Sequence, residues 1–337
     1  MRQTGKSKGG NKLKGTLKVA LVLSLVLVLL AGSVVVAQGA AIRMGLEAKH
    51  GRYKAWTVVV DDTLFIFGGE DWEEPTPTEY YNFKTGEWGE YGVESWPPAG
   101  ENSAVVVVNG NIFCLGGENE TGTNKKVYLF DIEDGDWEVL PGQASQGHSD
   151  AGAAVIGEKI YMVGGEDDDL ANEGFEYAAH VDIYNTKTNR WERGTDCPLP
   201  RQDTFVVALG TDIYLLGGQG GNIDDSMTAN VMIYDTINDS WSQGPDLPYP
   251  WEHPRAAVVD GKMYVMTGKG EGGYYIFELD PAVNEWREME SYNLVTRYGS
   301  GITVYEGEIY VACGRNMTGE AQSSIEIYNP ALDNYVD

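Results

Sequence analysis

Cysteine and histidine are scarce in this sequence, with three cysteines and four histidines among 337 residues. Cys114 and Cys313 fall in predicted strands of two sheets that have a third sheet between them, and Cys197 lies in a connecting loop. Cysteines so far apart cannot form a disulfide. None of these residues has the close spacing typical of a metal site. The composition therefore excludes a disulfide scaffold, and we expect neither a metal site nor a cofactor.

Basic residues are also few, at 24 Lys and Arg against 51 Asp and Glu, which gives a formal net charge of −27. Six of the basic residues lie in the first 18 residues, which contain no acidic residue. The remainder of the chain therefore has 18 basic and 51 acidic residues. Such a surface repels a phosphate backbone, and we expect no nucleic-acid partner. The acidity serves either solubility or the binding of cations.

One long apolar run follows the basic residues 1–18. Residues 19–37 are interrupted only by Ser24, Gly32 and Ser33. A helix of this length spans about 28 Å, close to the hydrocarbon core of a bilayer. We expect a signal anchor, and the alternative is a signal peptide cleaved after Val35-Val36-Ala37. In both cases the basic flank stays in the cytoplasm. The remainder is then exported, either held at the cell membrane by one span or secreted.

Glycine is abundant, with 43 residues, and much of it recurs in a fixed order. A glycine pair, replaced by Thr-Gly and Cys-Gly in the last two repeats, ends an apolar strand. A second strand then ends in Tyr or Phe followed by Asp, Asn or Glu, and a further aromatic residue comes after it. The glycine positions are Gly68-Gly69, Gly116-Gly117, Gly164-Gly165, Gly217-Gly218, Thr267-Gly268 and Cys313-Gly314. The aromatic positions are Trp88, Trp137, Trp191, Trp241, Trp286 and Tyr335, at spacings of 49, 54, 50, 45 and 49 residues. The sequence therefore contains six repeats.

A period of about 50 residues with four short strands per repeat is typical of a β-propeller. The glycine pair, the Tyr-Asp or Tyr-Asn ending and the Trp resemble the kelch family, over roughly residues 52–337. We predict an all-β fold, a six-bladed kelch-type β-propeller preceded by one N-terminal signal-anchor or signal-peptide helix. The Tyr and Trp residues are expected to pack between blades. The family implies no single activity, so function must be argued from a site.

The predicted domains are a basic cytoplasmic tail at 1–18, the anchor or signal peptide at 19–37, a spacer at 38–51 and the propeller at 52–337. The sixth repeat ends just after Tyr335 and lacks an outer strand. Counting back from the first repeat places Ile42–Glu47 where an outer strand would lie. We therefore expect Ile42–Glu47 to pair beside the sixth blade, because closing the ring removes its open edges.

Two rings of residues are expected at one mouth of the propeller, because the loop into strand one and the loop out of strand two open on the same side. The lead-in residues, 16 positions before each glycine pair, are Arg52, Gly100, His148, Arg201, Trp251 and Arg297. The residues directly after the pairs are Glu70, Glu118, Glu166, Gln219, Lys269 and Arg315. In kelch-type adaptors of ubiquitin ligases, arginines at the lead-in position face a peptide-binding mouth. The resemblance carries this role to Arg52, Arg201 and Arg297.

This mouth is predicted to be acidic on blades one to three and basic on blades four to six. Arginines around Trp251 suit a carboxylate, through bidentate hydrogen bonds and stacking, and such a carboxylate belongs to a protein or to an acidic sugar. The alternative is that the arginines pair internally with the surplus acids. The run Asp167-Asp168-Asp169 also lies here, without the ligand spacing of an EF-hand.

We interpret the chain as an exported, membrane-anchored module that binds a protein or glycan ligand, rather than as an enzyme. Two alternatives stay open: a self-assembling surface component, and a carbohydrate-active isomerase similar to the exported kelch sialic-acid mutarotases. The isomerase needs an acid/base pair beside the sugar carboxylate, such as Glu166 near Arg201. Copper-oxidase chemistry of the kelch type is excluded, because Cys114 is poorly placed and His148 is the one clear histidine of the ring.

Overall fold

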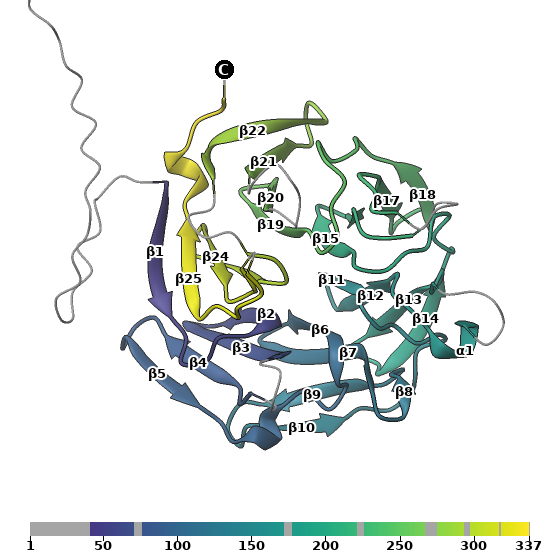
Figure 1. The fold of residues 1–337 in the computed structure, drawn as a ribbon. Coiled ribbons are helices and arrows are strands. Elements are labelled where there is room, and N and C mark those ends of the chain that lie inside the picture. The colour runs from purple at the N-terminus through teal and green to yellow at the C-terminus, as the bar shows by residue number, and fades with distance from the viewer. Residues whose placement is uncertain are drawn as a thin grey trace, which may run out of the picture. The chain divides into compact units, whose positions relative to one another are not determined.

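The computed structural model describes residues 41–70, 76–171, 177–220, 226–266, 275–292, 297–316 and 318–336. In this part of the chain the strands form six antiparallel sheets, arranged as blades around a central axis (Figure 1). Helical structure in the described residues is limited to α1 (Asp168–Ala171) and the short 3₁₀ helices η1 (Val93–Ser95) and η2 (Pro330–Leu332). The predicted all-β, six-bladed propeller is therefore confirmed.

Each blade has four main strands, and the first of them lies nearest the axis. Blade one contains β2 (Tyr53–Val60), β3 (Thr63–Glu70), β4 (Glu79–Asn82) and β5 (Glu87–Glu90). Blade two contains β6 (Glu101–Val108), β7 (Asn111–Asn119), β9 (Val127–Asp131) and β10 (Asp136–Val139), and the short β8 (Gly122–Thr123) pairs with β7. Blade three contains β11 (Gly152–Ile156), β12 (Lys159–Val163), β13 (Val181–Asn185) and β14 (Arg190–Gly194).

Blades four to six repeat this order. Blade four contains β15 (Phe205–Leu209), β16 (Asp212–Leu216), β17 (Val231–Asp235) and β18 (Ser240–Gln243). Blade five contains β19 (Arg255–Val259), β20 (Lys262–Met266), β21 (Tyr275–Asp280) and β22 (Glu285–Tyr292). Blade six contains β23 (Gly301–Tyr305), β24 (Glu308–Ala312) and β25 (Ser324–Tyr328), and its fourth strand is β1 (Ile42–Glu47).

The Asp or Asn that ends the third strand of each blade shapes the turn that follows. Its side-chain oxygen accepts a hydrogen bond from a backbone N–H two residues later, as Asp131 does from Glu133 at 2.8 Å. An Asx turn of this kind replaces backbone hydrogen bonds and reverses the chain. The residues in this position are Asn82, Asp131, Asn185, Asp235, Asp280 and Asn329. The Asp or Asn that ends the third strand is thus a turn signal in all six blades.

The repeated aromatic residues hold blades together, as expected. Tyr184 and Trp191 are directly opposite each other on β13 and β14, with ring centroids 5.1 Å apart. The indole N–H of Trp241 donates to the backbone oxygen of Thr195 in the preceding blade at 2.9 Å. Six apolar clusters of buried residues fill the spaces between neighbouring blades in the described part of the chain. The core is therefore divided among the blade interfaces.

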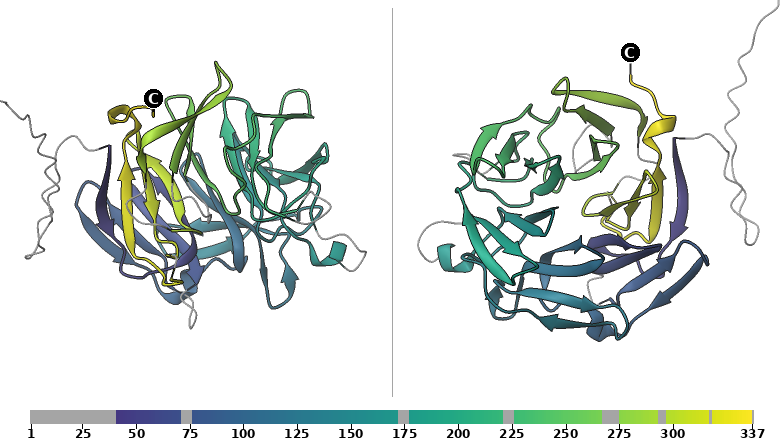
Figure 2. Two further views of the ribbon diagram at one scale, coloured as in Figure 1. Left: turned by 45° about the horizontal axis from the view of Figure 1, so that its top comes forward. Right: turned by 180° about the vertical axis from the view of Figure 1, so that it is seen from behind.

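The structure confirms that β1 closes the ring. β1 pairs antiparallel with β25, and Ile42 lies opposite Tyr328. The Arg43 guanidinium makes a bidentate ion pair with Glu308, at 2.8 and 2.7 Å. Both views in Figure 2 show β1, in purple, along the outer side of the yellow strands of blade six. The first strand of the described chain thus completes the last blade.

The C-terminal residues lie on a different blade. Tyr335 forms a bridge with Met289 of β22, so the chain end adds to the outside of blade five. The Tyr335 hydroxyl donates to Glu278 at 2.7 Å, and the Arg287 guanidinium lies 4.9 Å from the centre of the Tyr335 ring. The last repeat therefore supplies only three strands to its own blade.

The expected membrane segment at residues 19–37 lies outside the described residues. Within them, no helix has both the length and the apolar character needed to cross a bilayer.

Deleting Ile42–Glu47 should lower the melting temperature by several degrees. The deletion leaves one edge of β25 unpaired, next to the buried Ile325 and Ile327 of the cluster between blades six and one. A loss of about 1 kcal/mol shifts the melting point of a large domain by about 2–4 °C. Differential scanning calorimetry measures the shift. An unchanged melting temperature would contradict a stabilising role for this strand.

Candidate functional site

The two rings predicted at the mouth do lie next to each other. In the five blades where both loops are described, the residue after the lead-in residue pairs with the residue after the glycine pair, as in Glu101 with Glu118 and Ser149 with Glu166. The second glycine of the pair makes this approach possible in these blades. Gly165 has a φ of 87°, and a Cβ there would lie 2.4 Å from the backbone oxygen of Ser149. We call the side of the propeller with these loops the mouth face.

The lead-in arginines lie inside the protein. Arg52 is completely buried, and its guanidinium donates to Glu79 at 2.5 Å and to the backbone oxygens of Gly68 and Pro77 at 3.0 Å. Glu79 is also completely buried and accepts hydrogen bonds from the backbone of Lys49. Removing one partner of such a pair costs about 3–5 kcal/mol, because the other charge stays buried. Arg52 therefore holds blade one together.

Arg201 and Arg297 have the same placement, each only 1% exposed. Arg201 donates to the side chain and backbone oxygens of Asn230 at 3.0 Å, and burial lowers its pKa to about 10. Arg297 donates to the backbone of Cys313 at 2.8 Å and lies 3.6 Å from the buried Glu326 carboxylate. Arg52 and Arg297 therefore pair internally with acids, as in the alternative left open by the sequence, whereas Arg201 donates to Asn230. The expectation of an acidic-sugar ligand loses its support, because it depended on accessible guanidinium groups.

His148 replaces arginine in blade three and is also buried. Its Nε2 lies 2.9 Å from Asp182, and its Nδ1 lies 2.8 Å from the backbone oxygen of Gly164. Desolvation raises the pKa of Asp182, but hydrogen bonds from His148 and Ser145 outweigh it and leave that pKa below its usual value. Trp251, 3% exposed, replaces arginine in blade five and packs in the cluster between blades four and five.

The other predicted residues are spread over the mouth face. Arg315 is buried with its guanidinium 4.3 Å from the centre of the Tyr53 ring. Glu118 and Glu166 are partly exposed. The backbone of Glu70 pairs with Tyr53, and Lys269 lies outside the described residues. Of the ten predicted ligand-binding residues, the structure therefore leaves two, Glu118 and Glu166, with described side chains open to solvent.

A third ring, which the sequence analysis missed, surrounds the axis two residues after each lead-in residue. We call it the axial ring, and its members are Lys54, Asn102, Asp150, Asp203, His253 and Gly299. All six have φ between 48° and 60°. Backbone hydrogen bonds join neighbouring members, for example from His253 N–H to Asp203 at 2.8 Å and from Asp203 N–H to Asp150 at 3.1 Å. The sequence did contain a signal for this ring. Five repeats have a polar residue, most often Asp or Asn, at the same position, and Asp and Asn adopt positive φ more readily than most residues.

The side chains of the axial ring form one charged cluster. The Lys54 ammonium donates to Asn102 Oδ1 and to Asp150 Oδ1, both at 2.8 Å. His253 Nε2 lies 3.2 Å from Asp203 Oδ1. Burial lowers the pKa of His253 well below its usual value, aided by Lys54 and Arg255, so this imidazole is neutral at pH 7.

Below the axial ring, three side chains block the axis. The Trp56 and Phe205 rings stack at 6.5 Å, and the Arg255 guanidinium lies 5.9 and 5.5 Å from them. The Arg255 Nε–H donates to the backbone oxygen of Ser300. Beyond this plug an apolar cavity of about 290 Å³, lined by residues such as Val58 and Ala154, runs along the axis. A solute that approaches the axis from the mouth face therefore contacts the polar side chains of the axial ring first. The Trp56, Phe205 and Arg255 side chains lie behind that ring and block the axis.

Within the described residues, Asp150, Asp203 and His253 are the group with the ligand atoms for a metal ion, all within 4.8 Å of one another. Two cationic side chains of the protein already compensate the negative charges of these carboxylates. Lys54 binds Asp150, and the buried Arg255 guanidinium lies close enough to both carboxylates for their charges to act on its pKa. With both carboxylates ionised the cluster carries no net charge, which disfavours a further cation at its centre.

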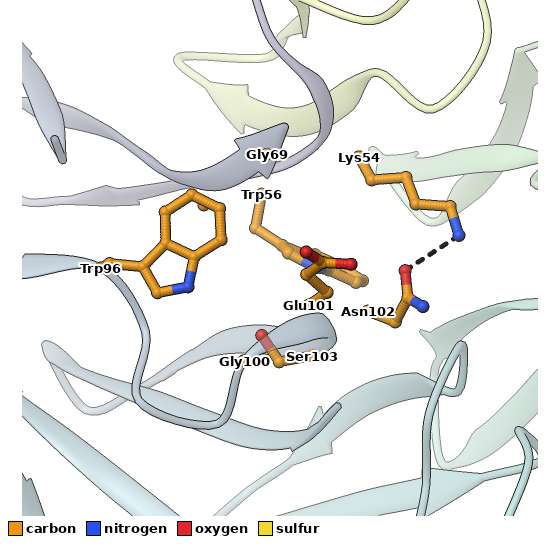
Figure 3. Close-up of a pocket in the computed structure, with 9 residues that line it drawn as sticks. Lys54, Trp56, Gly69, Trp96, Gly100, Glu101, Asn102 and Ser103 are labelled. Atoms are coloured by element: carbon orange, nitrogen blue, oxygen red, sulfur yellow. Dashed lines mark hydrogen bonds between the residues drawn. The ribbon is translucent and has the colours of Figure 1, made fainter. Parts of the chain in front are cut away.

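A narrow pocket opens beside the axial ring, between blades one and two. Trp56 of β2, Trp96 at the end of η1 and Glu101 at the start of β6 line it. In Figure 3 the Glu101 carboxylate is seen between the Trp96 indole and the Lys54 ammonium, which is turned toward Asn102. The pocket is partly open to solvent, and its volume of about 10 Å³ leaves room for about one water molecule.

Asp203 makes the stability of the protein depend on pH. Burial, with the neighbouring carboxylate of Asp150, raises the pKa of Asp203 to about 7. The folded protein therefore keeps a proton that the unfolded chain releases between about pH 4 and 7, so the free energy of unfolding falls as pH rises through this range.

Asn at position 203 resembles the protonated carboxyl and removes this effect. The melting temperature of Asp203→Asn should be close to that of the wild type near pH 4 and higher than that of the wild type at about pH 8. The exposed Asp136→Asn serves as the control, and thermal melts across this range measure both. A difference in melting temperature between Asp203→Asn and wild type that stays constant with pH would contradict the raised pKa of Asp203.

Comparisons with known proteins agree with this fold. The KLHDC2/KLHL20/DRC7 Kelch-repeats domain matches residues 41–195, and the Kelch motif matches residues 200–248. The two matches cover blades one to four.

Curated relatives match about half of the chain. The Kelch-like protein terF of Aspergillus terreus is 28% identical over 189 residues, 51% of this chain and 40% of that protein. Alpha-scruin of Limulus polyphemus is 28% identical over 185 residues, 52% of this chain and 20% of that protein. Kelch-like protein 40 of Xenopus laevis is 26% identical over 164 residues, 47% of this chain and 25% of that protein. The matched region is thus well under two thirds of the length of each relative. The two family models together establish that the chain belongs to the kelch-repeat family.

Proposed function

We propose that this chain is an exported kelch propeller that binds a protein partner through its mouth face. Kelch propellers in general are protein-binding modules, and loops on a rigid scaffold are the usual place for recognition. The observation that carries the proposal is the axial ring. It places five polar side chains around the axis and joins its members by backbone hydrogen bonds.

The shape and chemistry of the mouth favour binding over catalysis. The axial charges are paired with one another, and the buried lead-in arginines are out of reach of a sugar carboxylate. The isomerase hypothesis depended on those arginines. A partner would instead contact the exposed rim of the face, which includes Glu101, Glu120 and Asp168.

Peptide display against the full-length protein tests the binding role. Peptides selected on the wild type should lose binding to Gln202→Arg, which places a bulky charge beside the axial ring. They should keep binding to Thr211→Arg, a control at the exposed turn between β15 and β16 on the opposite side. Surface plasmon resonance with both variants measures the difference. Equal loss in the two variants, or loss only with Thr211→Arg, would place the site elsewhere.

We further propose that residues 19–37 anchor the protein in the cell membrane with the propeller outside. The 19-residue apolar run and its basic flank support this. The chain should stay in the membrane fraction after an alkaline wash, and protease added outside the cell should digest the propeller. The double variant Leu25→Arg, Val28→Arg should abolish both results. A shortened chain in the medium would show cleavage and overturn the anchor, while export would stand.

A further inference from the structure

The cavity beyond the plug is a channel along the axis with apolar walls. The first strands of all six blades line it with Val, Ala, Ile, Trp and Phe side chains, and Thr57 and Thr303 are the polar exceptions. Its volume of about 290 Å³ is large, since about 15 Å³ is enough for one water molecule. Trp56 and Phe205 form the end toward the mouth face. The channel can therefore take the apolar part of a ligand.

The other end of the channel is surrounded by the six turns that join the first strand of each blade to the second. We call these the exit turns, and they are residues 61–62, 109–110, 157–158, 210–211, 260–261 and 306–307. The strand rise of about 3.3 Å per residue places them about 17 Å from the level of Trp56. The exit turns contain no basic residue and five acidic ones: Asp61, Asp62, Glu158, Asp260 and Glu306. The open end of the channel is therefore acidic.

The lysines near the exit turns are already paired with acidic residues. The pairs are Lys84 with Asp62 and Glu306, Lys187 with Glu158, Lys159 with Glu192, and Lys262 with Glu278. Asp61 and Asp260 are exposed, and their carboxylates have no ion pair among the residues that the structure describes. These two carboxylates are therefore open to the cation of a ligand.

Backbone groups restrict the width of the ligand. The first strand of each blade is the inner edge of its sheet, so the N–H and C=O groups on that edge border the axis and need water or another polar partner. An eight-carbon chain takes about the volume of eight water molecules, and the channel has room for about twenty. A single aliphatic chain thus leaves space for water beside the strands, which a bulky apolar ring would displace.

We propose that the axial channel binds a single aliphatic chain that ends in an ammonium group. The chain lies against the apolar side chains of the six first strands, and its burial removes apolar surface from water. The ammonium group stays at the exit turns, where Asp61 and Asp260 attract it. This site lies on the far side of the plug from the mouth face. The inference thus goes beyond the proposed protein-binding function and does not depend on it.

Protection of a thiol inside the channel tests the proposal with the full-length protein in lipid nanodiscs. Thr303 lines the channel and is partly exposed, so Thr303→Cys supplies a thiol that a small reagent, methyl methanethiosulfonate, can modify. The natural Cys114, Cys197 and Cys313 are buried, and burial raises the pKa of each thiol, which keeps them slow to react. Mass spectrometry measures the rate of modification with and without each ligand.

Four ligands separate the contributions of the chain and of the charge: octylammonium, butylammonium, octanol and octanoate. Octylammonium should halve the modification rate at a concentration at least about tenfold below that of butylammonium, because four more methylene groups are buried. That concentration should also be about fivefold below that of octanol, and further below that of octanoate, because the exit turns are acidic. Equilibrium dialysis gives the free concentrations, since eight-carbon ligands also enter the lipid.

Variants then locate the ammonium group. In the Thr303→Cys background, Asp61→Asn with Asp260→Asn should weaken protection by octylammonium about fivefold and leave protection by octanol unchanged. Both positions have a φ of 50°, which asparagine tolerates, so the turns are kept. Glu94→Gln with Glu120→Gln removes the same charge from exposed residues of the mouth face and should leave protection unchanged. Melting curves check that each variant is folded.

Several outcomes would overturn the inference. One is equal protection by octylammonium and any of the other three ligands. Others are an equal loss in the exit-turn and mouth-face double variants, and no protection by octylammonium at about 10 mM. A thiol in Thr303→Cys that does not react even without ligand would show that the channel is closed to small molecules, and the proposal would fail on that result as well.

Discussion

Each blade of this propeller can bury its two faces only against its two neighbours, so the fold depends on a closed ring. The apolar clusters lie between blades, and none of the described clusters belongs to one sheet alone. An open ring would leave two such faces in water and two strand edges unpaired. The pairing of β1 with β25 and the backbone hydrogen bonds of the axial ring are two separate means of closure, at the rim and at the axis.

Closure explains why so many charged groups are buried. The loops at the mouth end in positive-φ glycines whose neighbouring carbonyl groups need donors. Arg52, Arg201 and Arg297 supply several N–H groups each in a planar arrangement, which suits adjacent backbone oxygens. These arginines therefore fix the loops from below. Because these three guanidinium groups point inward, recognition under the proposed binding function falls to the residues around them.

The fold was readable from the sequence because the repeat encodes local structure: glycine pairs at strand ends, Asx turns and cross-strand aromatic pairs each recur in register. The position of β1 followed from counting within that repeat. Side-chain direction was not encoded in the same way. Whether Arg52 points to solvent or under its own loop depends on the Glu79 carboxylate of another strand. The pocket at Trp96 also escaped prediction, because it depends on a short 3₁₀ segment outside the repeat pattern.

The position of β1 also sets an order in time. During synthesis the strand at Ile42–Glu47 is made before any blade, and its partner β25 is made after five blades are complete. Until then β1 has no native neighbour, and the edge it will cover does not yet exist. Contacts this distant in sequence form slowly, since a long loop must close first. The ring can therefore close only after nearly the whole chain has been made, and a chain stopped before Ser324 would keep an unpaired first strand.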